Sequence, residues 1–205
     1  MYQGERFNAW THLVGAALAS IGSVWLLVLA SLEGNPYKIV GVAVYGATLV
    51  LLYTASTLYH SVHGPVKRWL KKLDHLSIYL LIAGSYTPFC LVSLTGIWGW
   101  SLLGVVWGLA IIGMLQEIKP RSEARVLSIV IYSVMGWIIL VAIKPLLASL
   151  GVNGVAWLLA GGISYTVGII FFVYDTKVSY FHGVWHLFVI AGSLLHFVAV
   201  RLYVL

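Results

Sequence analysis

Long apolar runs alternate with short polar stretches along almost the whole chain. Each run has the roughly 20 residues that a helix needs to cross about 30 Å of hydrocarbon. The runs cover residues 10–31, 38–61, 74–94, 97–115, 126–144, 152–173 and 183–203. This pattern predicts an all-α integral membrane protein, a bundle of seven transmembrane helices, in which residues 1–205 form a single domain.

Two features inside these runs bear on how the helices pack. Gly104 and Gly108 form a small-xxx-small pair, a spacing that favours close helix contact in membranes. Pro88 lies well inside the run 74–94 and is expected to kink that helix, because proline lacks the backbone N–H donor.

The composition agrees with a protein that lies in lipid. The chain of 205 residues is 61% hydrophobic and only 9% charged, whereas a soluble domain averages about 25% charged residues. We therefore expect the cell membrane as its location and membrane lipids as its surroundings. The net charge of +6 comes from short basic clusters between apolar runs, which is typical of membrane-protein loops, so no nucleic acid partner is expected. Cys90 is the only cysteine, which excludes an intramolecular disulfide and a site of several thiolates.

The basic residues also predict the orientation, because short cytoplasmic loops are enriched in lysine and arginine. With the N-terminus inside, the outer segments hold only Lys38, Lys144 and Arg201. The inner segments hold the others: Arg6, Lys67, Arg68, Lys71, Lys72, Lys119, Arg121, Arg125 and Lys177. We therefore expect a cytoplasmic N-terminus and a C-terminus outside.

Histidines provide the candidate chemistry, because ionisable groups at membrane depth are costly and therefore suggest function. His182 and His186 are one helical turn apart on one face, the spacing at which a helix presents two imidazoles to one metal. His60 ends the second run and Asp74 begins the third. In the expected orientation these helix ends meet at the inner side, which predicts a metal site.

The remaining candidates are assigned by position. Ser56 precedes His60 by one turn and shares its face, although such a serine often bonds back to the carbonyl one turn earlier. His63 and His75 are expected to be solvated side chains at the membrane interface. His196 lies about 15 Å beyond His186 along the helix, toward the opposite leaflet, and is excluded from the site.

Several motifs together resemble a known family. They are Glu5-x-x-Asn8-x-x-Thr11-His12, Ser56-Thr57-Leu58-Tyr59-His60, Lys72-Leu73-Asp74, Ala83-Gly84-Ser85-Tyr86-Thr87-Pro88 and His182-Gly183-Val184-Trp185-His186. With these motifs, the chain resembles the hemolysin III family, the bacterial branch of the progestin and adipoQ receptor (PAQR) superfamily, which is similar to the alkaline ceramidases. The resemblance covers essentially the whole chain.

The resemblance implies a specific site. His60, His182 and His186 are expected to bind one zinc ion, and Asp74 to hold the water bound to it, although imidazole and carboxylate ligands also suit iron, cobalt or nickel. The chain lacks the long N-terminal region and ectodomain loops of the adiponectin receptors, so no protein hormone is implied. Glu5, Asn8 and His12 are interpreted as a structural network at the inner helix ends.

Three imidazoles with one open position are the ligand pattern of a catalytic zinc, which lowers the pKa of bound water to about 7. Asp74 is expected to act as the proton acceptor and Ser56 to donate to a developing oxyanion. The sequence thus favours a zinc-dependent hydrolase of a lipid amide or ester that enters from the bilayer.

Three other functions differ in how well the sequence supports them. A non-enzymatic membrane-lipid sensor with a structural zinc stays open. A cytolytic protein is less favoured, because no span carries a polar stripe that would line a pore. A retinal-binding pump is excluded, because the run 183–203 lacks the lysine needed for a Schiff base.

Overall fold

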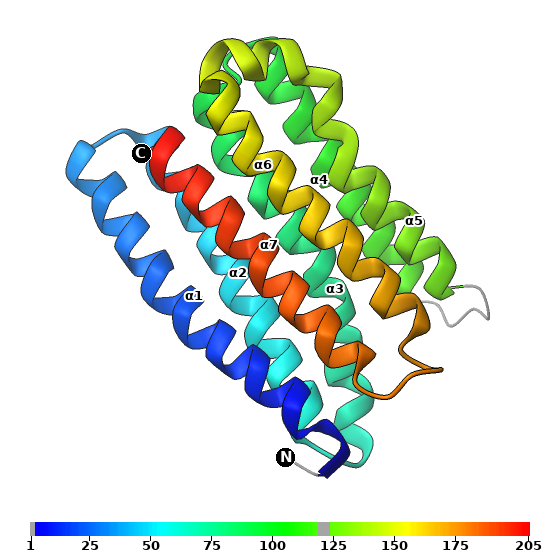
Figure 1. The fold of residues 1–205 in the computed structure, drawn as a ribbon. Coiled ribbons are helices and arrows are strands. Elements are labelled where there is room, and N and C mark those ends of the chain that lie inside the picture. The colour runs from blue at the N-terminus through cyan, green and yellow to red at the C-terminus, as the bar shows by residue number, and fades with distance from the viewer. Residues whose placement is uncertain (1–2, 119–123) are drawn as a thin grey trace.

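The computed structural model describes residues 3–118 and 124–205, and within these ranges every regular element is helical. The helices pack against one another in one bundle, and the two termini lie at opposite ends of it (Figure 1). The elements are η1 (Gln3–Glu5), α1 (Arg6–Glu33), α2 (Pro36–Ser61), α3 (Pro65–Pro88), η2 (Phe89–Ser93), α4 (Ile97–Ile118), α5 (Ala124–Trp137), η3 (Ile138–Ala142), α6 (Ile143–Tyr174) and α7 (Phe181–Tyr203).

Among the described residues, six helical stretches are long and apolar enough to cross a membrane. They are Arg6–Glu33, Pro36–Ser61, Pro65–Ser93, Ile97–Ile118, Arg125–Tyr174 and Phe181–Tyr203. Large apolar side chains such as Ile21 and Ile97 are exposed on the outside of the bundle, at 70% and 80%. Such an apolar exterior suits lipid and not water, so the expectation of a helical membrane bundle is confirmed in outline. Lys119 and Arg121, which were assigned to an inner segment, lie outside the described residues.

The 50-residue stretch Arg125–Tyr174 is far longer than one crossing requires, because about 20 helical residues span the hydrocarbon. In Figure 1 the ribbon rises along α5 and descends along α6. Within α6, Gly151 departs from helical geometry with φ 68° and ψ 177°, a conformation that is essentially restricted to glycine. The chain therefore reverses within this stretch, between the expected runs 126–144 and 152–173.

Helix α3 differs from its expected course at both ends. It begins at Pro65, earlier than residue 74, after Gly64 with φ 76°. Proline favours a first helical position, because its fixed φ suits a helix and its missing N–H has no partner there. Asp74 consequently lies inside α3. At the other end, α-helical geometry stops at Pro88, and the π-helical turn η2 follows.

Glycines bring some helices together but not the pair that was expected to do so. A methyl group added at Gly84 of α3 would come within 2.1 Å of the Thr48 Oγ1 atom of α2. At Gly104 and Gly108, the same methyl group would meet no described atom within 4 Å. The expected packing role of Gly104 and Gly108 is therefore wrong for the described residues, and Gly104 lies on the exposed side of α4.

Replacement of Gly151 by alanine tests the reversal in α6. The Gly151→Ala change should lower the free energy of unfolding by about 1–3 kcal/mol, because a Cβ atom is strained at this backbone conformation. Unfolding in mixed detergent micelles, followed by circular dichroism, measures the change. Gly104→Ala is the control and should be neutral or slightly stabilising. Equal stability of the Gly151→Ala variant and the wild type would contradict the assigned geometry.

Candidate metal centre

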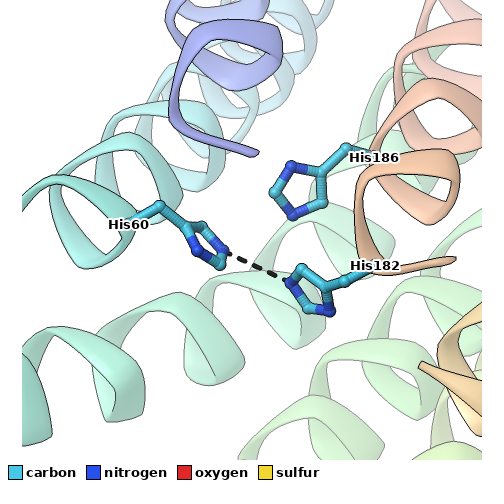
Figure 2. A group of neighbouring side chains, drawn as sticks. All are labelled: His60, His182 and His186. Atoms are coloured by element: carbon cyan, nitrogen blue, oxygen red, sulfur yellow. Dashed lines mark hydrogen bonds between the residues drawn. The ribbon is translucent and has the colours of Figure 1, made fainter. Parts of the chain in front are cut away.

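Three histidine side chains meet between the end of α2 and the start of α7. Figure 2 shows His60 on α2 facing His182 and His186 on α7. One potential ligand atom of each histidine lies within 4.8 Å of those of the other two, and the Nε2 atoms of His60 and His182 are 3.3 Å apart. Two nitrogens that share a tetrahedral zinc are separated by about 3.3 Å, given bonds of about 2.0–2.1 Å. The three imidazoles are therefore arranged so that they can hold one metal ion.

The second ring nitrogen of each histidine interacts with oxygen. The Nδ1 atom of His60 contacts the Glu5 carboxylate, and that of His182 lies 2.8 Å from Oδ2 of Asp175. The Nδ1 atom of His186 lies 3.2 Å from the Asn8 carbonyl oxygen. Carboxylate and carbonyl oxygens accept hydrogen bonds, so each Nδ1 carries the proton and each Nε2 keeps a lone pair for a metal. Histidine ligands of metals usually have such partners.

Gly183 explains how α1 reaches this site. A methyl group added at Gly183 would lie 2.3 Å from Cδ1 of Phe7 and 3.0 Å from Oδ1 of Asn8. Glycine at this position leaves room for the Phe7 and Asn8 side chains of the first turn of α1. The Asn8 carbonyl of the same turn lies at His186. His12 of α1 also stacks on His186, with ring centroids 3.6 Å apart.

Asp74 and Ser56 lie beside the histidines and interact with each other. The Ser56 hydroxyl on α2 is buried. It forms a hydrogen bond with the Asp74 side chain on α3. The hydroxyls of Thr57 and Ser61 instead bond back to the carbonyl one turn earlier. Asp74 is not part of the group of mutually close ligand atoms, so its position suits an indirect role and not direct ligation.

The two acidic partners of the histidines lie outside the apolar helices and are ionised. Burial disfavours the charged form of Glu5, but hydrogen bonds with His60 and Asn8 and the charge of Lys67 outweigh burial and lower its pKa well below the usual value. Burial likewise opposes ionisation of Asp175, whose pKa is nevertheless lowered by its bonds to His182 and Arg125. The site therefore contains two fixed negative charges beside its imidazoles.

A cavity of about 1200 Å³ opens from the three histidines into the bundle. Ser56 and Asp74 line it near the histidines, and apolar side chains of α6 such as Val155 and Leu159 line it farther away. The cavity also reaches His196. Mostly apolar walls with a small number of polar groups are typical of sites for small, largely apolar ligands.

The structure brings His60, His182 and His186 together as the sequence predicts, with Asp74 and Ser56 nearby. Nδ1 of His75 instead lies 2.7 Å from Oε1 of Glu117. Nε2 of His196 lies 3.2 Å from the Leu158 carbonyl oxygen of α6. Sequence reasoning missed the roles of two acids. The sequence pattern indicates a helix network for Glu5 and no role for Asp175. Their rarity was a usable signal, because the chain has only six acidic residues.

This chain is similar in sequence to several known proteins. The family model described as Haemolysin-III related matches residues 1–197. A Hemolysin-3 of Bacillus cereus is 47% identical over 202 residues, which are 98% of this chain and 92% of that protein. A Hemolysin-3 homolog of Bacillus subtilis (strain 168) is 42% identical over 97% of this chain and 93% of its own length. The human Monocyte to macrophage differentiation factor is 26% identical over 96% of this chain and 82% of its own length.

A double-mutant cycle tests the contact between α1 and α7. Gly183→Ala alone should lower the free energy of unfolding by about 1–3 kcal/mol, because the new methyl group overlaps the Phe7 ring. In a Phe7→Ala background the same change should cost less, since the overlapping ring is gone, with a coupling of about 0.5–3 kcal/mol. Denaturant unfolding of the four proteins in detergent provides the measurement. Strictly additive effects would show that Phe7 and Gly183 are not in contact.

Proposed function

This chain belongs to the haemolysin-III related family, and from that premise we propose that it is a zinc-dependent intramembrane hydrolase of a lipid amide or ester. Its family and its long apolar helices identify it as a multi-pass integral membrane protein that contacts membrane lipids. One observation carries the proposal. Three imidazoles, each bonded to oxygen at Nδ1, face one another at the end of a large cavity with apolar walls.

The proposal includes a topology of seven crossings with a cytoplasmic N-terminus and an external C-terminus. Two observations support it: the chain reverses within the stretch Arg125–Tyr174, and its termini lie at opposite ends of the bundle (Figure 1). The positive-inside rule supports the orientation, because Lys67, Lys71 and Lys72 lie on the first turns of α3, at the same end as the N-terminus. The candidate metal centre then lies near the cytoplasmic side.

The donor set fits zinc. Neutral imidazole nitrogens are preferred zinc ligands, and sites with three protein ligands leave a position for water or substrate. Among the described residues, the group contains no fourth ligand of this kind. When bound, zinc would polarise a carbonyl group and lower the pKa of water, which makes hydroxide available at neutral pH.

The residues of this chain have separate roles in the proposed reaction. Asp74 takes a proton from the attacking water and passes it to the departing nitrogen or oxygen, as the bond between that atom and the carbonyl carbon breaks. A fatty acid and an amine or alcohol result. Ser56 holds the Asp74 carboxylate through their hydrogen bond, and donation to an oxyanion would require this bond to open. The apolar wall at Val155 and Leu159 accommodates the acyl chain.

A non-enzymatic membrane-lipid sensor with a structural zinc is the second candidate. It is favoured by the way in which the site joins helices, because His60 of α2 faces His182 of α7 and the Asn8 carbonyl of α1 contacts His186. A metal there would stabilise the bundle without any reaction. In that case removal of the metal should lower thermal stability, and no lipid turnover should be found.

Metal analysis of histidine variants tests the proposed ligands. The purified protein should retain about one zinc per chain, and His60→Ala, His182→Ala and His186→Ala should each lose most of it, because each removes one of only three protein ligands. Elemental analysis by mass spectrometry provides the measurement. His63→Ala is the matched control, because His63 is exposed and lies outside the group. Retention of zinc by the His186→Ala variant would refute the assigned ligand set.

Replacement of Asp74 tests the proposed chemistry. Asp74→Asn should lower fatty acid release from lipid amides or esters by about 10²–10⁴-fold and leave the zinc content unchanged. Product release from the purified protein in detergent is followed by mass spectrometry. Glu117→Gln is the control, because Glu117 also lines the cavity but pairs with His75. Activity that survives both a chelator and Asp74→Asn would rule out the mechanism.

A further inference from the structure

Two of the three histidines each contact a carboxylate that also contacts a basic side chain. In one chain of contacts, Lys67 lies 3.2 Å from Oε1 of Glu5, and Oε2 of Glu5 contacts Nδ1 of His60. In the other, Arg125 lies 2.7 Å from Oδ1 of Asp175, and Oδ2 of Asp175 lies 2.8 Å from Nδ1 of His182. Each carboxylate thus uses one oxygen for the imidazole and the other for the cation.

The members of each chain of contacts come from different elements. Lys67 is on α3, Glu5 in η1 and His60 on α2, whereas Arg125 is on α5, His182 on α7 and Asp175 in the connection before α7. A carboxylate that is bonded at both oxygens cannot rotate without losing a bond. The imidazole that it contacts is therefore held in one orientation, with Nε2 facing the other histidines.

The Arg125 side chain is itself fixed. Its guanidinium lies over the Phe172 ring, 4.4 Å from the ring centroid, and also donates a hydrogen bond to the Phe172 carbonyl. Planar guanidinium groups suit such stacked and carboxylate-bonded positions better than lysine does. Phe172, near the end of α6, thereby fixes the Arg125 side chain, and Arg125 in turn fixes the Asp175 carboxylate.

We propose that Glu5 and Asp175 are positioning residues, which set the tautomer and orientation of His60 and His182 and thereby the affinity of the centre for its metal. This inference rests on the proposed zinc site and extends it to residues that do not touch the metal. In metal sites generally, loss of such a hydrogen-bond partner lowers metal affinity by about 10–100-fold. Lys67 and Arg125 act one step farther out, by holding the two carboxylates.

Two other acidic pairs provide matched controls. Glu33 pairs with Lys38, but neither contacts a histidine, and Glu33 is 39% exposed. Glu117 pairs with His75 at 2.7 Å, outside the group of three histidines. If Glu5 and Asp175 acted only as ion-pair partners, their removal would resemble the removal of these two carboxylates.

The test is a zinc titration of the full-length protein in detergent against a competing chelator. Glu5→Ala and Asp175→Ala should raise the dissociation constant for zinc by about 10–100-fold. Glu5→Gln and Asp175→Asn should have smaller effects, because an amide oxygen still accepts the Nδ1–H bond. The Glu33→Gln and Glu117→Gln controls should bind zinc like the wild type. Cobalt absorption spectra of the Glu5 and Asp175 variants should shift, because the geometry of the imidazole ligands changes.

The conservative variants keep the test decisive if the alanine variants do not fold. The inference would be overturned if Glu5→Gln and Asp175→Asn keep the wild-type zinc affinity and an unchanged cobalt spectrum. Any alanine variant that folds would then also have to bind zinc with wild-type affinity. This result would leave the zinc site itself intact, provided that His60→Ala abolishes binding. If the wild-type protein binds no metal, the proposed function fails and the inference fails with it.

Discussion

An unpaired polar atom buried among apolar helices costs several kcal/mol, so partners for the ring nitrogens stabilise a histidine in such surroundings. His60, His182 and His186 have such partners in a shared arrangement. The Nδ1 atoms bond to oxygens from η1, α1 and the connection before α7, so the Nε2 atoms are left to face one another. A metal ion bound between them would supply the remaining partner for all three at once. These contacts bring η1, α1, α2 and α7 together at one end of the bundle.

The site and the cavity depend on the same helices. Close approach of α1 to α7 at Gly183 brings the Asn8 carbonyl to His186, and the hydrogen bond between Ser56 and Asp74 joins α2 to α3. The cavity lies between these helices and α6, with the three histidines at one end and mostly apolar side chains such as Val155 along the rest of the wall, which also includes His196. A ligand with one polar group and a long apolar part matches this division.

Much of the centre could be predicted from the sequence, because two local rules apply to it. The four-residue spacing of His182 and His186 fixes their common face, and the alternation of apolar runs places His60 at the same end of the bundle. The outer partners could not be found in this way. Asp175 lies in a short connection whose path no periodicity determines, and Glu5 reaches His60 only through tertiary packing. The start of α3 at Pro65 was missed because hydropathy records the apolar part of a helix and not its polar first turns.

The order in which the parts of the candidate metal centre are synthesised has a consequence for biogenesis. Glu5 and His60 are synthesised and inserted early, whereas Asp175 and the two histidines of α7 emerge from the ribosome last. Chains are made from the N-terminus, and early segments wait for their later partners. The candidate metal centre is therefore complete only after the final helix has been made. A chain that stops before Phe181 would hold His60 without its imidazole neighbours.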